Sequence, residues 1–214
     1  MNTLSLKHTL PVIFFEAGMP ASEIWLKEVG FIKGRLYLIT AASGVGKSSL
    51  LNYIFGERTD YTGDIFFDDR NINTLRPSEW LDIRQRRLGF IFQGLRLFTD
   101  LTVKENIDLK NRLTGFKSKT EINDLLEQTD IADKAGTKIR FLSFGQQQRV
   151  AIIRALCQPF DFLLMDEPFS HLDEQNVALL SSIITAELQR QGSGLLITSL
   201  GTQYPFNYHS ILKL

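Results

Sequence analysis

Leu36-Tyr-Leu-Ile-Thr40, followed directly by Ala41-Ala-Ser-Gly-Val-Gly-Lys-Ser48, is the stretch of sequence on which the fold depends. Its first five residues form a short apolar run that predicts a buried strand, and Lys47–Phe55 has the apolar spacing of a helix. A glycine-rich loop between a strand and a helix cradles phosphate, because its backbone N–H groups turn inward and the helix N-terminus adds positive charge. This order predicts a phosphate-binding loop (P-loop) at residues 41–48.

The residue types of this loop agree with nucleotide binding. Gly44 and Gly46 lack the Cβ atom that would obstruct the close approach of a phosphate. Lys47 is predicted to reach the β- and γ-phosphates, and the Ser48 hydroxyl is predicted to ligate Mg²⁺. Ala41 stands where glycine is usual, and a glycine-rich turn without a nucleotide is the alternative. The nucleotide-binding candidates of this segment are Ser43, Gly44, Val45, Gly46, Lys47, Ser48 and Ser49.

Two carboxylates end a second apolar run, Phe162–Met165. Asp166 would orient Mg²⁺, and Glu167 would lie beside the γ-phosphate and polarise the attacking water. A solvated acidic turn is the alternative interpretation. Together with the phosphate loop, the pair predicts a magnesium-dependent nucleoside triphosphatase.

The composition excludes several classes of protein. Among 214 residues, 24 Lys and Arg balance 24 Asp and Glu, so bulk charge does not hold the chain on nucleic acid or an anionic membrane. Hydrophobic residues at 43% exclude general disorder. No segment has the apolar length of a signal peptide or a membrane span, so we expect a soluble protein. Cys157 lies in an apolar stretch, which favours a packed thiol over a reactive one.

Strand-like runs alternate with helix-like runs, which predicts an α/β layered fold. The strand candidates are Leu4–Lys7, Ile24–Val29, Leu36–Thr40, Asp64–Phe67, Leu88–Phe92, Phe162–Met165, Leu195–Thr198 and Ile211–Leu214. The helix candidates are Lys47–Phe55, Ser78–Arg86, Val103–Arg112, Thr120–Thr129, Gly145–Leu156 and Glu174–Arg190. Residues 99–159 are mainly helical and lie between two strand candidates, which predicts an inserted helical subdomain.

The stretch Leu142-Ser-Phe-Gly-Gln-Gln-Gln-Arg149 resembles the LSGGQ signature of ATP-binding cassette (ABC) ATPases. With Lys47 and the Asp166-Glu167 pair in the family's order, the resemblance covers nearly the whole chain. It implies a single domain over residues 1–214: a P-loop NTPase (RecA-like) core with an antiparallel β subdomain and an inserted helical subdomain. Residues 1–93 and 160–214 would form the core with its β subdomain, and residues 94–159 the helical subdomain with the signature.

The resemblance assigns further site residues. Gln93 looks like the Q-loop glutamine, which in the family contacts Mg²⁺ and the attacking water and couples to the membrane partner. Ser170-His-Leu-Asp173 looks like the D-loop. Phe14 lies where the family places an aromatic residue on adenine, although Phe15, Trp25 or a core role for Phe14 are alternatives.

The signature residues Ser143, Gly145 and Gln146 stand at the start of a predicted helix, where free N–H groups and a hydroxyl suit an anion. In the family, this segment meets the γ-phosphate held by the other subunit, so two ATP molecules are sandwiched in a head-to-tail homodimer. A helix cap without a nucleotide is the alternative for Ser143.

Two positions depart from the family pattern. Phe144 replaces the first glycine of the signature, so its ring must turn away from the nucleotide for the dimer to close. Ser199 stands where the family has a histidine that contacts the γ-phosphate, and a hydroxyl cannot carry its positive charge. Losing one such contact costs about 2–4 kcal/mol of transition-state stabilisation, or about 10²-fold in rate. Since Glu167 is retained, slow hydrolysis is expected with Ser199 at this position.

The segment after Gln93 looks like the branch that serves lipoprotein release, macrolide efflux and cell division. Phe98, Leu101 and Val103 would form an apolar rim for a coupling helix of an integral membrane permease, with contacts near Gln93–Val103; packing within the chain is the alternative. The chain ends soon after its last strand candidate, which favours a stand-alone homodimeric subunit, cytoplasmic and bound to the membrane through its permease.

The leading function is therefore an ATPase subunit, with ATP and Mg²⁺ as cofactors, that powers a transporter or a mechanotransmission complex. An ATP-gated regulatory clamp with weak hydrolysis, as in a cell-division regulator, is the alternative. A chromosome-maintenance or translation-factor cassette is disfavoured, because the chain lacks a long heptad insertion, a second cassette and net basic charge. No nucleic-acid partner is expected.

Overall fold

The computed structural model describes residues 1–18 and 21–214, which form an antiparallel sheet, a parallel sheet and helices around them. The antiparallel sheet, in the order β2-β1-β4-β5, contains β1 (Thr3–Pro11), β2 (Glu28–Ile32), β4 (Tyr61–Phe67) and β5 (Arg70–Asn71). The parallel sheet, in the order β6-β7-β8-β3-β9, contains β3 (Leu36–Thr40), β6 (Leu88–Ile91), β7 (Phe162–Asp166), β8 (Gly194–Ser199) and β9 (Ser210–Lys213). The helices are α1 (Phe14–Ala17), α2 (Lys47–Ile54), α3 (Pro77–Arg86), α4 (Val103–Asn111), α5 (Lys119–Gln128), α6 (Phe144–Leu156) and α7 (Glu174–Gln191).

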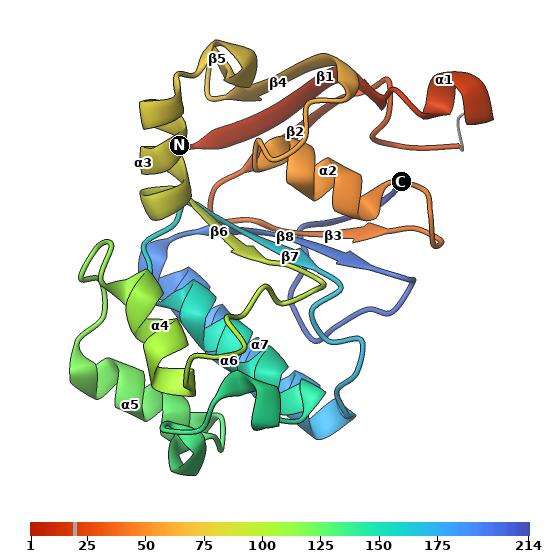
Figure 1. Cartoon of the computed structure of the whole chain (residues 1–214). Helices are drawn as coiled ribbons and strands as arrows, with labels where there is room; N and C mark the ends of the chain where they lie inside the picture. The colour runs from red at the N-terminus through yellow and green to blue at the C-terminus, as the bar shows by residue number, and fades with distance from the viewer. Residues whose placement is uncertain (19–20) are drawn as a thin grey trace.

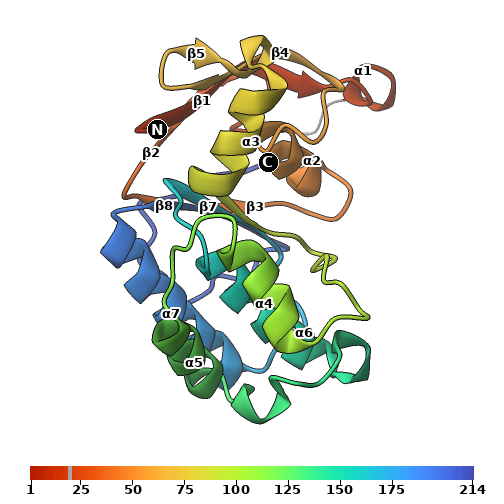
Figure 2. The same cartoon turned by 60° about the vertical axis from the view of Figure 1, so that its left-hand side comes forward.

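The helix α2 lies between the two sheets. Figure 1 shows the antiparallel sheet above α2 and the helices α4–α7 below the parallel sheet, and Figure 2 shows the same layers from a second direction. Leu50, Leu51 and Ile54 of α2 are fully buried in the core between the sheets. Leu163 and Ile197 belong to a second core on the helical side. The parallel sheet is covered on both faces, which explains why its central strands are continuously apolar.

Parallel pairing brings segments that are distant in sequence to one edge of this sheet. Thr40 at the end of β3 lies opposite Ser199 of β8, and Thr198 lies opposite Asp166 of β7. The glycine loop after β3 and the acidic pair at the end of β7 therefore share the carboxyl edge, where α/β sheets bind ligands.

The predicted α/β fold is confirmed, and each predicted helix is present with each end within one residue of the prediction. Side chains fix the helix starts: Thr102, Ser118 and Ser143 each accept a hydrogen bond from the backbone N–H three residues later. Cys157 is fully buried, and burial raises the pKa of its thiol to about 12, which confirms a packed thiol. Within the described residues, no helix is both long enough and apolar enough to cross a bilayer.

The predicted strand Ile24–Val29 is wrong, because the strand in this region is β2, which begins at Glu28. The Ser22 hydroxyl accepts hydrogen bonds from the N–H groups of Ile24 and Trp25 at 3.0 and 2.9 Å, and Leu26 adopts a φ of 57°. This turn satisfies the backbone locally. Ile24 and Trp25 are fully buried in the core around α2, so their apolar character reflects packing rather than strand pairing.

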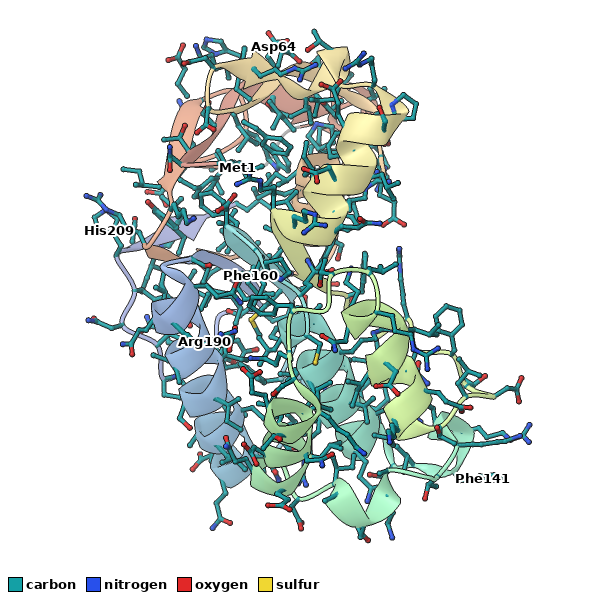
Figure 3. All side chains as sticks on the ribbon, turned by 90° about the vertical axis from the view of Figure 1, so that its left-hand side faces the viewer. Met1, Asp64, Phe141, Phe160, Arg190 and His209 are labelled. Atoms are coloured by element: carbon teal, nitrogen blue, oxygen red, sulfur yellow. The ribbon has the colours of Figure 1, made fainter. Side chains whose placement is uncertain are left out.

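A buried ion pair ties the loop before α5 to α7. Lys117 Nζ lies 2.9 Å from Glu187 Oε2, and both side chains are less than a tenth exposed (5% and 8%). Arg190, labelled in Figure 3, also donates to Glu187. Burial alone raises the pKa of Glu187, but hydrogen bonds from Arg190 and Lys117 outweigh it and hold that pKa below its ordinary value.

We predict that Lys117→Met lowers the free energy of unfolding by about 3 kcal/mol, because a buried carboxylate loses its ammonium partner. Urea denaturation measures this loss. The pKa of Glu187 is depressed in the folded state, so the contribution is present above the ordinary Glu pKa and fades as pH falls through the folded value. The difference between wild type and variant should therefore shrink below about pH 4. A pH-independent difference would contradict this account.

Candidate functional site

The glycine loop enters α2 through two residues in the left-handed region. Gly44 has a φ of +84° and Gly46 a φ of +99°. A Cβ atom at Gly46 would also lie 3.1 Å from Trp25 Cζ2. Both positions therefore favour glycine, and a glycine loop at the start of a helix is a conformation suited to anion binding by backbone N–H groups.

Lys47, the first residue of α2, is 5% exposed and folds back over the loop. Its ammonium donates to the carbonyl oxygens of Ala41 and Ala42 at 3.0 and 2.9 Å, and lies 3.2 Å from Glu167 Oε1. The ammonium is thus held where the phosphate loop and the acidic pair meet.

Thr198 organises the acidic pair. Its hydroxyl donates to Asp166 Oδ1 at 2.8 Å and accepts from the N–H of Glu167 at 3.1 Å, with Thr198 itself fully buried. Glu167 has a φ of 46°, a strained value for a non-glycine residue that reorients the chain as β7 ends. The bonds to Thr198 hold Asp166 at the strand end and turn the carboxylate of Glu167 toward Lys47. Sequence reasoning did not single out Thr198.

These groups converge on a cavity of about 420 Å³ at the carboxyl edge of the parallel sheet. The sequence-predicted residues that line it are Phe14, Ser43, Gly44, Gly46, Lys47, Ser48, Ser49, Gln93 and Glu167. Pro11, Ile13, Arg58 and Leu200 also line it, although no motif in the sequence pointed to them. Among the described lining residues, Glu167 provides the carboxylate group.

The three aromatic residues considered for stacking on adenine occupy different positions relative to the cavity. Phe14 lines the cavity, and its ring centroid lies 6.4 Å from that of Trp25. Trp25 is fully buried and donates from Nε1 to the carbonyl oxygen of Val45 at 3.4 Å, so its faces are not offered to a ligand. Phe15 is 62% exposed and lies outside the described lining.

Several predicted site residues lie off this cavity in a single chain. Ser199 is fully buried, and its hydroxyl accepts from the N–H of Gly201 at 3.2 Å, while the next residue, Leu200, lines the cavity. Val45 and Asp166 are not among the residues of the described lining. The remaining predicted residues are Ser143, Gly145 and Gln146, at the start of α6.

The start of α6 is capped internally. Ser143 Oγ accepts from the N–H of Gln146 at 3.3 Å, and Gln146 Oε1 accepts from the N–H of Ser143 at 3.0 Å. The Ser143 hydroxyl still has its own hydrogen to donate, so capping and anion binding are compatible. The Phe144 ring packs edge-on against His171, with ring centroids 4.8 Å apart, which turns it toward the segment Ser170–Asp173.

The donor set fits a magnesium-bound nucleotide. The glycine cradle and the ammonium of Lys47 suit phosphate, and the Ser48 hydroxyl and the Asp166 carboxylate are the hard oxygen ligands that Mg²⁺ prefers. The described residues contain no group of three or more His, Cys, Asp or Glu side chains that could hold a metal ion by themselves. This agrees with a cation held by one or two protein oxygens together with phosphates.

A second, more apolar cavity of about 350 Å³ lies beside α4 and α6. Its apolar lining residues include Phe55, Phe90, Phe92, Phe98, Leu109 and Leu113. Phe98 is 58% exposed, in agreement with the rim expected from the sequence. Val103 is fully buried in the helical core, so this part of the predicted rim is wrong. Leu101 is outside the described lining, and its place in the rim stays a prediction.

We predict that Thr198→Val lowers the free energy of unfolding by about 1–3 kcal/mol, because Asp166 and the N–H of Glu167 lose a buried partner. ATP hydrolysis should fall more than ATP affinity, since the carboxylates are mispositioned while the glycine loop is intact. Thermal denaturation and steady-state hydrolysis measure the two effects. Thr198→Ser, which keeps the hydroxyl, is the matched control, and equal behaviour of the two variants would contradict this role.

Comparison with known proteins identifies the family. The family model described as "ABC transporter" matches residues 28–170. The lipoprotein-releasing system ATP-binding protein LolD of Buchnera aphidicola is 34% identical over 170 residues, covering 78% of this chain and 74% of that protein. The trimethylamine N-oxide transport system ATP-binding protein TmoW of Pelagibacter ubique is 38% identical over 146 residues, covering 66% of this chain but only 42% of that protein.

Solved structures agree. The dimeric structure of MJ0796, described as a bacterial ABC transporter cassette, matches with a TM-score of 0.75 and 25% identity over 92% of this chain and 88% of that one. The same cassette in a post-hydrolysis state bound to ADP and Pi matches with a TM-score of 0.72. With the glycine loop, the acidic pair and the signature helix arranged as described, the chain belongs to the ABC transporter family as an ATP-binding subunit of the ATPase type.

Proposed function

We propose that this chain hydrolyses ATP with Mg²⁺ as a head-to-tail homodimer and thereby energises a separate membrane permease at the cytoplasmic face of the membrane. The observation that carries the proposal is the convergence of Lys47, Ser48, Gln93 and Glu167 on one cavity. Retention of Glu167 in that cavity favours hydrolysis over an ATP-gated clamp.

In this mechanism, Phe14 stacks on the base and the loop N–H groups bind the phosphates. Lys47 exchanges its bonds to Ala41, Ala42 and Glu167 for phosphate oxygens, which leaves the Glu167 carboxylate free to accept a hydrogen bond from the attacking water. Ser48, Asp166 and Gln93 would hold Mg²⁺, which supplies neutralisation of charge on the transferring phosphoryl group.

The dimer accounts for the signature residues. Ser143 and Gly145 lie at the start of α6, outside the described lining of the cavity in the same chain. In the proposed dimer, a second copy presents its Ser143 hydroxyl and helix N-terminus to the γ-phosphate. Phe141, 70% exposed beside the signature, lies at the outer end of the helical layer in Figure 3, where a second copy would cover it. The similarity to the dimeric structure of MJ0796 supports this arrangement.

We further propose that residues 94–159 move as a helical subdomain against a core of residues 1–93 and 160–214. Gln93 lines the nucleotide cavity, and its neighbours Phe92 and Arg96 line the second cavity. Arg154 of α6 donates to the carbonyl oxygens of Leu95 and Arg96, both at 2.8 Å. The short segment of residues 92–96 thus contacts both cavities and the helix α6.

The second cavity suits a short helix of the permease. Aromatic and leucine side chains provide its apolar surface, and Lys110 and Arg154 lie within it. Burial lowers the pKa of Lys110 to about 8 and that of Arg154 to about 10, so both cations are poorly solvated. An amphipathic helix that carries an acidic side chain would complement both features. The match to LolD supports a permease of the lipoprotein-release branch.

We predict that Glu167→Gln reduces ATP turnover at least 10²-fold while ATP still binds, because the amide keeps the size of the side chain but cannot polarise water. The variant should accumulate as a dimer in ATP, measured by size-exclusion chromatography with light scattering. The double variant Glu167→Gln/Ser143→Ala is the control and should stay monomeric. Wild-type turnover by Glu167→Gln would contradict the catalytic role of Glu167. Dimerisation of the double variant would contradict the proposed contact between Ser143 of one copy and the nucleotide bound by the other.

We predict that Phe98→Asn reduces co-purification with the membrane permease at least tenfold without changing ATP affinity, because it removes an exposed apolar contact outside the nucleotide cavity. Ile32→Asn is the matched control, since Ile32 is 42% exposed on β2 and lies outside the second cavity. An equal loss with both variants would argue against this docking surface.

A further inference from the structure

Arg58 lies in the turn between α2 and β4 and lines the nucleotide cavity. Its Nη1 donates to Ser49 Oγ at 2.9 Å, and its Nε donates to Asp60 Oδ1 at 2.9 Å. Nη2 donates to the other oxygen of Asp60, and the guanidinium lies over the Tyr53 ring, 5.4 Å from its centroid. The side chain is 43% exposed, so it is fixed in direction and still reachable by a ligand.

These contacts link the guanidinium to both parts of the cavity: the part near Phe14, where the base is expected, and the part near Lys47, where the phosphates are expected. On the base side, the carbonyl oxygen of Asp60 accepts from the N–H of Val12 at 3.0 Å, two residues before Phe14. On the phosphate side, Ser49 follows Lys47 and Ser48 in the first turn of α2. Phe14, Lys47 and Arg58 line the same cavity, so a nucleotide with its base on Phe14 and its terminal phosphates on Lys47 would pass near Arg58.

The chemistry of Arg58 at this point suits a phosphate. A guanidinium has five N–H donors, and three of them are used by Ser49 and Asp60. The other two have no partner among the described residues, and a planar pair of donors matches a phosphate group. Arg58 and Lys47 are the cations of the described lining, and Lys47 is predicted to serve the β- and γ-phosphates. The α-phosphate is the remaining charged group.

We propose that Arg58 is a nucleotide-binding residue that donates to the α-phosphate, with Asp60 and Ser49 as positioning residues that hold its guanidinium in place. This inference rests on the proposed use of the cavity for ATP. Because an α-phosphate contact is made equally to ATP and ADP, Arg58 strengthens nucleotide binding before and after hydrolysis, and does not select between the two nucleotides.

Titration calorimetry of the full chain with ATP and with ADP, in the presence of Mg²⁺ and at fixed ionic strength, tests the proposal. Arg58→Gln should weaken both nucleotides about tenfold and leave the ATP-to-ADP affinity ratio unchanged. Arg58→Lys should recover part of the loss, because charge returns without the planar donor pair. Arg70→Gln is the matched control, since Arg70 makes a similar two-bond pair with Glu79 outside this cavity.

Two results would overturn the proposal. An unchanged affinity in Arg58→Gln, with a lowered melting temperature, would show that Arg58 only fastens the turn to Asp60. A loss of affinity for ATP but not for ADP in Arg58→Gln would show that Arg58 contacts the γ-phosphate and not the α-phosphate. Failure of the wild-type chain to bind ATP would instead contradict the proposed function, so the two failures are distinguishable.

Discussion

The parallel pairing of β8 with β3 on one side and with β7 on the other is the constraint on which the site depends. It carries the phosphate loop and the acidic pair to one edge, with Lys47 Nζ 3.2 Å from Glu167 Oε1. A register shift of one residue would move every side chain of β8 to the opposite face of the sheet and remove the Thr198 hydroxyl from Asp166. Because β7 and β8 are buried along their whole length, such a shift would also disrupt close packing on both sides of the sheet.

Burial strengthens the electrostatic interaction between Lys47 and Glu167. Lys47 and Glu167 are each less than a tenth exposed, so their interaction is weakly screened, and each depends on the other for its charge to be tolerated. A phosphate bound to the loop competes for Lys47 and alters the surroundings of Glu167. In the proposed mechanism, nucleotide binding and the release of the Glu167 carboxylate are therefore coupled through the single ammonium group of Lys47.

Two residues depart from the family pattern. Phe144 is a large apolar side chain where the family has glycine, and Ser199 is a neutral side chain where the family has histidine. Phe144 packs edge-on against His171 but is still 44% exposed. Leu200 lines the cavity, whereas Ser199 is fully buried and accepts a hydrogen bond from the N–H of Gly201. Glu167 therefore lines the cavity while Ser199 is outside its described lining, and slow turnover stays a prediction from the sequence.

The sequence by itself determined the phosphate loop, the acidic pair, the signature helix and the α/β order, because each is a local pattern whose residue types and spacing are required by its chemistry. It also determined the helices, since capping residues and apolar periodicity act within a few residues. Only the tertiary structure decided that Ile24 and Trp25 are buried in a turn, that Val103 is buried in the core, and that Thr198 joins the two carboxylates. It alone brought Arg58 to the cavity, because β4 pairs with β1 and no pattern in sequence reports which distant strands will meet.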